Sequence, residues 1–400
     1  MSIDSPWVLL GLLLLAGAVG FYASRRPRPS ALGADHVRTN YLAGVNFLVN
    51  EQPDRALEAF LRAAELDGDT VETHFALGSL YRRRGEVDRA IRIHQNIVNR
   101  ASLEPVQREQ AQYALAQDYL RAGLLDRAEK ILEELAGAGT HRMAAMRKLI
   151  RIFEVERDWV RAIATHEELA KVGRPPQESA LGHYWCELAE TARTEGRLDA
   201  ALEHLRKARE TQRRFPRSAL IRADIAIEQG DKALAFDLLK GVIQQDAGLI
   251  VEAMPRLLRL ARTEAGEGDS LLARIVNARP DGLPEFAFAA IVGDALDFPT
   301  FQDLVRQQLR DDDTLAGLIR ALGRDPASLD ERALRELGAV LRRLAAATPR
   351  YRCAECGFSS TGHFWQCPGC KTWDSQRPLT RFDLVAGLES GAGHQARRSS

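Results

Sequence analysis

The chain begins with an uninterrupted apolar stretch unlike anything that follows it. The twenty residues Ser5–Ser24 carry no charged side chain. A helix rises ~1.5 Å per residue, so a stretch of this length matches a hydrocarbon core ~30 Å thick. Trp7 and Tyr22 stand near its two ends, as aromatic residues do at membrane interfaces. The pattern therefore predicts a single transmembrane helix, the anchor, within residues 1–24.

The charges beside this stretch predict its orientation. Asp4 precedes it, whereas Arg25, Arg26 and Arg28 follow it. Basic residues accumulate on the cytoplasmic side, so the N-terminus is expected outside and the bulk of the chain in the cytoplasm. A secretory signal begins with a basic segment, which this chain lacks, and a cleaved signal peptide or a buried helix is the alternative. Residues 25–34 are predicted to be a basic juxtamembrane linker.

From residue 35 the apolar and small positions recur with a fixed period. Gly44 and Gly78 are 34 residues apart, and so are Ala56 and Ala90. Later copies carry small residues at the matching positions, which let two helices approach closely, and larger residues that fill the gap to the next pair. Those positions include Tyr81, Ala116, Tyr119, Ala128, Leu132, Ala162, Leu169, Ala201, Leu205, Ala235 and Leu239.

Each copy is predicted to form two antiparallel helices of about 12 to 15 residues. One pair cannot bury its apolar face, whereas stacked pairs can. Four glycines are expected to end the first helix of a pair in a left-handed turn, namely Gly85, Gly123, Gly196 and Gly230. The spacing is that of the tetratricopeptide repeat (TPR). Residues 35–248 are therefore predicted to form about six TPR copies in an all-α solenoid.

Beyond residue 248 the period blurs. Residues 249–348 are predicted to be degenerate TPR-like helices, interrupted by Pro280, Pro284, Pro299 and Pro326. The tail 387–400 is polar and rich in Gly and Ser, and is predicted to be disordered.

Composition narrows the possible functions. Lys+Arg and Asp+Glu are equal at 55 each, so the chain lacks the global positive charge of a nucleic-acid-binding protein. The sequence contains none of the common signatures for phosphate-binding loops, serine hydrolases, zinc proteases or dinucleotide binding. His94 and His166 occupy the same repeat position and are expected to be packing residues. A binding protein that is not an enzyme is predicted.

Four of the five cysteines lie close together near the C-terminal end. Cys353 and Cys356 form one C-x-x-C pair, and Cys367 and Cys370 form a second after ten intervening residues. Two such pairs can place four thiolates around a tetrahedral ion, either iron or zinc. Four protein ligands close the site, which leaves no open position for Lewis-acid catalysis. A metal-binding domain is therefore predicted over residues 349–386.

The remaining residues of the cysteine segment, and the fifth cysteine, are expected to have structural roles. Gly357 follows the first pair, where the chain is expected to turn with positive φ. His363 is expected to be a surface or packing histidine, because four cysteines already complete the ligand set. Phe358, Phe364, Trp365 and Trp373 are predicted to be the small core around the metal. Cys186, in a repeat helix, is expected to be a small buried residue.

The first helices of the pairs are expected to line a groove for a peptide or helix of a partner. For each residue alone, ordinary solvated surface is the competing interpretation. The residues assigned to the groove are Phe75, Arg82, Arg83, Tyr113, Gln117, Arg121, Glu190 and Arg193.

With the anchor, the repeats and the cysteine pairs in this order, the chain resembles the lipopolysaccharide assembly protein B family. The matching stretches include YLAGVNFLVNEQPDRALEAF, RGEVDRAIRIHQNIVNRASL and PRYRCAECGF…FWQCPGCKTW. The resemblance implies an all-α TPR solenoid with an N-terminal single transmembrane helix and a small C-terminal rubredoxin-like zinc-ribbon domain. By position, the metal ligands carry over to Cys353, Cys356, Cys367 and Cys370.

The resemblance also implies a role at the inner membrane of Gram-negative bacteria. Members of that family promote degradation of the LpxC deacetylase, which commits precursor to lipid A, by the FtsH membrane protease. The implied function is a non-catalytic adaptor that regulates lipopolysaccharide biosynthesis through proteolysis, with no nucleic-acid partner. A scaffold for lipopolysaccharide synthesis and export enzymes, or an iron-based electron-transfer protein, are the alternatives.

Overall fold

The computed structural model describes residues 31–66, 70–101, 103–173, 179–212, 214–262, 268–277, 295–311, 329–347, 349 and 351–378. The predicted anchor at 1–24 and the predicted tail at 387–400 lie outside these residues. Within the described ranges, no helix combines the length and the apolar character that a membrane crossing requires.

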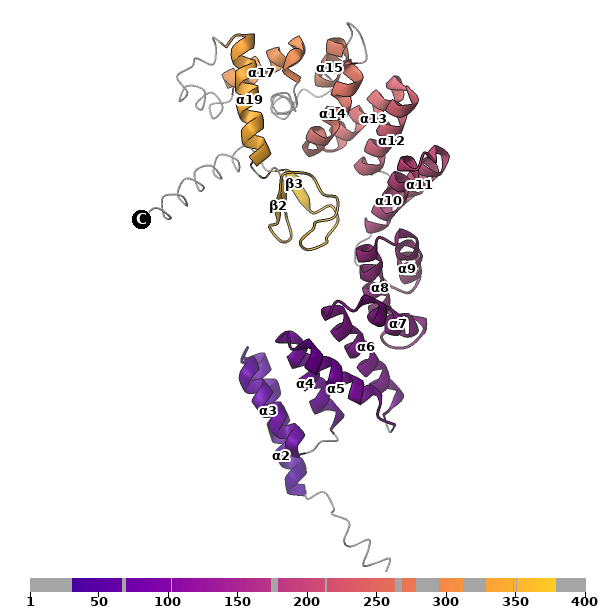
Figure 1. Ribbon diagram of the computed structural model, residues 1–400, viewed down its shortest axis with the longest axis vertical. Helices are drawn as coiled ribbons and strands as arrows, with labels where there is room; N and C mark the ends of the chain where they lie inside the picture. The colour runs from indigo at the N-terminus through magenta and orange to yellow at the C-terminus, as the bar shows by residue number, and fades with distance from the viewer. Residues whose placement is uncertain are drawn as a thin grey trace, which may run out of the picture. The chain divides into compact units, whose positions relative to one another are not determined.

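The described chain is helical up to residue 347 and ends in a small sheet (Figure 1). Helix α2 begins at Ala31, so it includes the last residues of the range assigned to the linker. The elements are α2 (Ala31–Val49), α3 (Pro53–Leu66), α4 (Val71–Arg83), α5 (Val87–Val98), α6 (Pro105–Arg121), α7 (Leu125–Gly137), α8 (Arg142–Glu156), α9 (Trp159–Val172), α10 (Ala180–Thr194), α11 (Leu198–Thr211), α12 (Pro216–Gln229), α13 (Lys232–Gln245), η1 (Ala247–Leu249), α14 (Ile250–Arg262), α15 (Gly268–Asn277), η3 (Ala295–Asp297), α17 (Pro299–Asp311), α19 (Glu331–Ala347), β1 (Tyr351–Cys353), β2 (Ser359–Ser360) and β3 (Gln376–Pro378).

The chain divides into two compact units. Unit 1 comprises residues 1–156 and 168–173, and unit 2 comprises residues 157–167 and 174–400. In unit 1, α2 packs on α3, α4 on α5 and α6 on α7, and each pair also contacts the next. In unit 2, α10 packs on α11 and α12 on α13 in the same way. These are the antiparallel pairs predicted from the 34-residue period.

Close helix approach within the pairs is visible at the small residues. In the described helices, the alanines one repeat apart are fully buried, namely Ala56, Ala90, Ala128, Ala162, Ala201 and Ala235. A Cβ added to Gly44 would lie 2.6 Å from the Phe60 ring, and one added to Gly78 would lie 2.5 Å from the His94 ring. Each glycine thus faces the residue sixteen positions later, which explains why a small residue is needed there.

The turns between paired helices use one left-handed residue each. Gly85, Gly123, Gly196 and Gly230 have φ of 82°, 75°, 76° and 80°, as predicted. The remaining turns place Glu51 and Arg157 in the same conformation, with φ of 57° and 59°. A side chain is uncommon at such φ. The backbone path of the repeat is therefore kept where the glycine is missing, and the glycine pattern alone did not predict these two turns.

Helices beyond residue 245 extend the core of unit 2. Leu239 of α13, Leu257 of α14 and Val305 of α17 belong to one buried apolar cluster. Leu334 of α19 belongs to it as well. The predicted irregular helices are thus packed against the last regular pair. The parts of that prediction at 263–267, 278–294, 312–328 and 348 lie outside the described residues.

The C-terminal strands form a three-stranded antiparallel sheet with order β2–β1–β3. Strand β1 is central, with Tyr351 opposite Ser360 on one side and Pro378 on the other. Strand β1 ends at Cys353, so the sheet leads the chain directly into the first cysteine turn.

Candidate metal centre

Two nearly identical backbone turns present the cysteines. The N–H of Cys353 donates to the carbonyl of Phe358 at 2.8 Å, and the N–H of Cys367 donates to the carbonyl of Thr372 at 2.9 Å. In each turn the residue after the second cysteine donates back to the first cysteine carbonyl, with Gly357 at 3.0 Å and Lys371 at 2.8 Å. The same cysteine turn, or knuckle, therefore occurs twice, at residues 353–358 and 367–372.

Both of those donating residues have a left-handed backbone. Gly357 has φ of 74°, as predicted, and Lys371 has φ of 61°. The second turn therefore adopts a glycine-like conformation with a lysine, which the sequence did not indicate.

The two knuckles bring four sulfur atoms together. The Sγ atoms of Cys353, Cys356, Cys367 and Cys370 all lie within 4.8 Å of one another. Two of the distances are 3.6 Å, between Cys353 and Cys370, and 3.7 Å, between Cys356 and Cys367. With Zn–S bonds of ~2.3 Å, tetrahedral ligands lie ~3.8 Å apart, so the sulfur set suits a single metal ion.

Hydrogen bonds favour the charged form, which metal binding needs, at two of the four thiols. Burial raises the pKa of Cys353, but the hydrogen bond with Ser375 and those from nearby backbone N–H groups lower it to about 6. Hydrogen bonds with Thr372 lower the pKa of Cys370. The hydrogen bond from the Phe358 N–H lowers the pKa of Cys356, but burial and the three neighbouring thiols outweigh it and raise this pKa to about 11. Four thiolates this close repel one another, and a cation relieves that repulsion.

The cysteine domain packs against the repeat helices of unit 2 through Trp373. This side chain is only 3% exposed. Its ring stacks on His183 of α10, with ring centroids 4.6 Å apart and planes within 18°. Edge-on contacts with Trp159 of α9 and Tyr184 of α10 complete the packing, at 6.2 Å and 5.9 Å. The residue three positions after the last cysteine is thus part of the repeat core.

A partly buried hydrogen-bond network surrounds this stack. His183 Nε2 lies 2.8 Å from Asp374 Oδ1, and Arg217 Nη1 of α12 lies 3.4 Å from His183 Nδ1. Because a guanidinium only donates, Nδ1 accepts and Nε2 carries the proton. Arg217 also donates to Glu187 at 2.6 Å and lies over the rings of Trp365 and Trp373.

The surroundings of His183 keep it neutral. Burial lowers the pKa of His183 and the charge of Arg217 adds to this, while the hydrogen bond with Asp374 acts in the opposite direction. Burial alone would raise the pKa of Asp374, but the hydrogen bond from His183 holds it below its usual value. A neutral imidazole that donates to a carboxylate is the result.

A second contact ties the sheet to α14. Tyr351 is 1% exposed, and its hydroxyl donates to Glu252 Oε1 at 2.8 Å. Gly248, in η1, lies against Pro378, since a Cβ added there would be 2.9 Å from the proline ring. The cysteine domain therefore contacts α10, α12, η1, α14 and Trp159 of α9, and all of these contacts lie within unit 2.

The predicted core of the cysteine domain is partly wrong. Phe358 and Phe364 are 38% and 44% exposed. So small a domain has little interior of its own, and its large rings Trp365 and Trp373 pack toward the repeats instead. His363 packs against Tyr351 and Trp365, outside the sulfur cluster, as predicted.

Other single-residue predictions agree with the structure. His94 and His166 are buried packing residues, 0% and 4% exposed. Cys186 is fully buried in α10, and burial raises its pKa to about 12, so its thiol stays protonated.

The residues assigned to a partner groove have diverse surroundings. In unit 1, Arg82 donates to the fully buried Asp118 at 2.7 Å, so it stabilises the packing of α4 on α6. Asp118 also binds His94. The Tyr113 ring packs against the His141 ring in a tilted arrangement, with centroids 4.8 Å apart. Arg83 and Arg121 are exposed, and Gln117 is half-buried.

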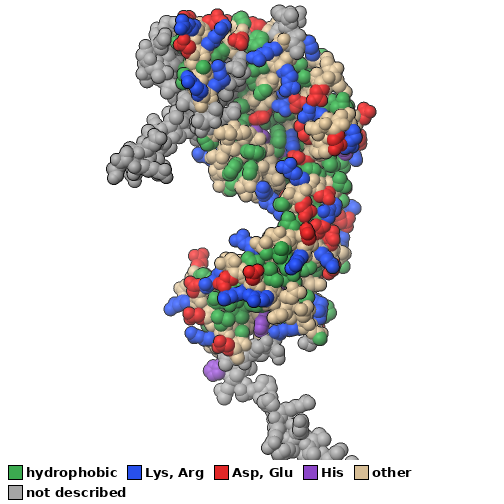
Figure 2. All heavy atoms as spheres, in the orientation of Figure 1, with side chains coloured by type: hydrophobic (Ala, Val, Ile, Leu, Met, Phe, Trp, Pro, Cys, Tyr) green, Lys and Arg blue, Asp and Glu red, His purple; other side chains and the backbone are tan. Residues whose placement is uncertain are grey.

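The other groove residues differ in the same way. In unit 2, Arg193 pairs with Glu190 at 2.6 Å and with Glu228 at 2.5 Å. Phe75 is half-buried on α4 of unit 1 and lines a pocket. On the face seen in Figure 2, basic and acidic side chains are interspersed over the described helices. A role of these residues in partner binding stays a prediction.

The fold and the sulfur cluster define a class, a TPR protein that ends in a rubredoxin-type metal-binding ribbon. The family described as "Tetratricopeptide repeat" matches residues 41–98, 113–178 and 186–250. The family described as "Rubredoxin metal binding domain" matches residues 351–378.

Comparison with curated proteins identifies the family. The lipopolysaccharide assembly protein B of Escherichia coli (strain K12) is 33% identical over 385 residues, covering 94% of this chain and 99% of that protein. The protein of the same name from Haemophilus influenzae is 26% identical over 391 residues, covering 93% of this chain and 98% of that protein. The chain belongs to the lipopolysaccharide assembly protein B family.

Solved structures resemble only part of the chain. The MamA protein is 18% identical with a TM-score of 0.35, covering 45% of this chain and 93% of that chain. YrrB, a TPR protein, is 16% identical with a TM-score of 0.33, covering 45% of this chain and 88% of that chain.

Proposed function

We propose that the chain is a non-catalytic adaptor that regulates lipopolysaccharide biosynthesis by promoting degradation of the LpxC deacetylase by an FtsH-type membrane protease. The observation that carries the proposal is the match to lipopolysaccharide assembly protein B over 94% of this chain and 99% of the relative. A TPR solenoid supports it, because stacked helix pairs offer long surfaces for other proteins.

The proposal includes an inner-membrane location, with the bulk of the chain in the cytoplasm. The apolar stretch Ser5–Ser24 and the arginines that follow it support this orientation. Tethering would confine the adaptor beside a membrane protease and raise their effective concentration.

The test is the cellular level of the deacetylase. Deleting the gene should raise that level, and the full chain should restore it. A chain that lacks residues 1–24 should restore it poorly, although it is produced in equal amount. Unchanged deacetylase after deletion would contradict the proposal.

The name of the relatives, lipopolysaccharide assembly protein B, also favours a second candidate, a scaffold that assembles lipopolysaccharide synthesis or export enzymes. Crosslinking in cells followed by mass spectrometry separates the two. Recovery of synthesis or export enzymes without the protease favours the scaffold, and recovery of the protease with the deacetylase favours the adaptor.

We also propose that Cys353, Cys356, Cys367 and Cys370 hold one iron or zinc ion. The convergence of the four Sγ atoms within 4.8 Å supports this. Such an ion would stabilise the ribbon, because so few residues bury little apolar surface. Elemental analysis should find about one ion per chain, and Cys367→Ser should lose it. The matched control, Cys186→Ala, should keep it.

The identity of the ion tests the electron-transfer alternative. Zinc without a reversible redox couple would exclude electron transfer. Iron with a reversible couple in the purified chain would support it.

A further inference from the structure

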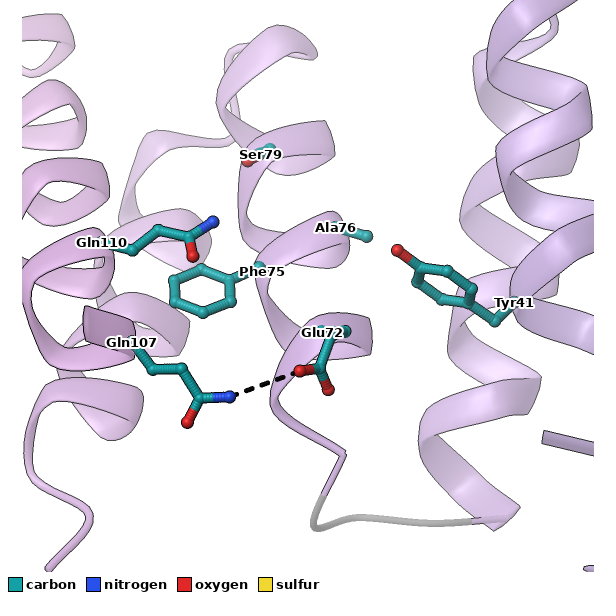
Figure 3. A pocket seen from close by; sticks show the side chains of 7 residues that line it. All are labelled: Tyr41, Glu72, Phe75, Ala76, Ser79, Gln107 and Gln110. Carbon is teal, nitrogen blue, oxygen red and sulfur yellow. Dashed lines mark hydrogen bonds between the residues drawn. The ribbon is translucent and has the colours of Figure 1, made fainter. Parts of the chain in front are cut away.

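A pocket of about 240 Å³ lies in unit 1 between the first helices of three consecutive pairs (Figure 3). Tyr41 comes from α2, and Gln107 and Gln110 come from α6. The remaining lining residues are Glu72, Phe75, Ala76 and Ser79 of α4.

The pocket is too small for most free ligands. Small-molecule sites usually measure ~300–1,000 Å³. A space of about 240 Å³ instead fits one long side chain of a larger partner. In Figure 3 the Phe75 ring lies beside the two glutamines and Tyr41 faces the pocket from the opposite side, so aromatic groups form two of its walls.

Among the described residues that line the pocket, Glu72 alone carries a charge. Gln107 Nε2 donates to Glu72 Oε1 at the long distance of 3.4 Å. Among the described residues, no lysine, arginine or histidine forms an ion pair with Glu72. A carboxylate beside aromatic rings is the environment that suits a lysine or arginine, because the cation can pair with the carboxylate and lie over a ring.

The two glutamines favour an extended segment as the carrier of that side chain. Gln107 and Gln110 are three positions apart on α6, so they lie on the same helix face. Each amide offers a donor and an acceptor, as a peptide backbone does. An extended segment that passes over α6 can hydrogen-bond to these amides while one of its side chains enters the pocket.

We propose that this pocket binds a lysine or arginine side chain of an extended segment in a partner protein, with Glu72 as the specificity-determining residue. The inference deepens the proposed adaptor function and rests on it for the existence of a partner. It assigns the chemistry of the contact, a basic side chain held by Glu72, Phe75 and Tyr41.

The test uses a displayed library of random 12-residue peptides selected on the purified full chain in detergent. Selected peptides should share a lysine or arginine at one position. Synthetic versions should bind Glu72→Gln about three- to fivefold more weakly, because a partly exposed ion pair contributes up to about 1 kcal/mol. Replacing the shared basic residue by alanine should cost no further affinity in that variant.

Charge reversal gives a sharper result. Glu72→Lys should abolish binding of the basic peptides and should select acidic ones from the same library. The matched control is Glu65→Lys, because Glu65 is exposed on α3, outside the pocket lining. Failure to select any binder, selection without a shared basic residue, or equal effects at the two positions would overturn the proposal.

A synthetic peptide of residues 25–34 is titrated in the same assay, because it carries Arg25, Arg26 and Arg28. If it binds more tightly than the selected peptides, the occupant is the chain itself and the partner proposal is wrong.

A cellular arm separates this inference from the proposed function. If gene deletion raises the deacetylase but Glu72→Lys behaves like Glu65→Lys, the pocket has no role in the adaptor and only this inference fails. If deletion leaves the deacetylase unchanged, the proposed function fails, and the peptide titrations alone judge the pocket.

Discussion

Removing the Trp373 contact between the cysteine domain (residues 351–378, here called the ribbon) and the repeat helices should lower the local stability of both. The Trp373→Ala change removes a ring that is 3% exposed, stacked on His183 and edge-on to Trp159 and Tyr184. The ribbon and α10 should then exchange their backbone hydrogens faster, because each loses the surface that covers it.

The magnitude follows from the buried ring. A tryptophan buries ~150–250 Å², which at ~25 cal/mol per Å² corresponds to about 4–6 kcal/mol as an upper value. Measured truncations of buried Trp or Phe cost about 3–5 kcal/mol. Neighbouring side chains can relax into part of the space, so we take the lower end of that range and expect about 3 kcal/mol in the opening free energy. That corresponds to roughly a hundredfold rise in the open population.

Hydrogen–deuterium exchange with mass spectrometry on the full chain in detergent measures this opening locally. Peptides that cover residues 351–378 and α10 should both exchange roughly a hundredfold faster in Trp373→Ala, provided that exchange reports the opening equilibrium. The metal content of each sample is measured in parallel, so that loss of the ion can be distinguished from undocking.

Two further variants test the cause. Phe364→Ala removes a ring of the same ribbon that is 44% exposed, and exchange should change little. His183→Ala cuts the stack from the repeat side and leaves the ribbon sequence intact. If α10 exchanges at the normal rate in both Trp373→Ala and His183→Ala, the stack does not hold the ribbon to the repeats and the reasoning is wrong.

Three further predictions concern the turns, the helix approach and pH. Arg157→Gly should raise the free energy of unfolding by about 0.5–1 kcal/mol and Gly85→Ala should lower it by about 1 kcal/mol, because both residues have left-handed φ. Denaturant titration measures both changes, and a change of the same sign in the two variants would contradict this. Gly78→Ala should cost about 1–3 kcal/mol in the same titration, because the new Cβ would lie 2.5 Å from the buried His94; a neutral effect would show that the repeat tolerates a wider spacing. The folded-state pKa of His183 is lowered, so its neutral form stabilises docking at neutral pH. This contribution is lost as the pH falls below about 6.5, where the undocked imidazole gains a proton. Hydrogen exchange of residues 351–378, corrected for intrinsic rates, should therefore accelerate on acidification more in the wild type than in His183→Gln.

Much of the fold was predictable because its signals are periodic or local. Fully buried alanines such as Ala56 and Ala90 recur at the 34-residue spacing, since every pair solves the same packing problem. Gly357 marked a left-handed turn because few other residues adopt that backbone readily. The sulfur cluster was predictable because two short C-x-x-C turns carry their geometry with them.

The sequence alone thus determined the helix pairs, the position of the left-handed glycines and the set of sulfur atoms. Tertiary structure alone decided that His183 meets Asp374, 191 residues away, and that Trp373 belongs to the repeat core and not to a core of the ribbon. Apolar and aromatic residues in a sequence predict burial but not the surface that buries them, because the hydrophobic effect is non-directional. Contacts between residues far apart in the chain also produce no periodic sequence pattern. Where the repeat lacks its glycine, at Glu51 and Arg157, packing of the flanking helices holds the backbone in a left-handed conformation that these residue types disfavour.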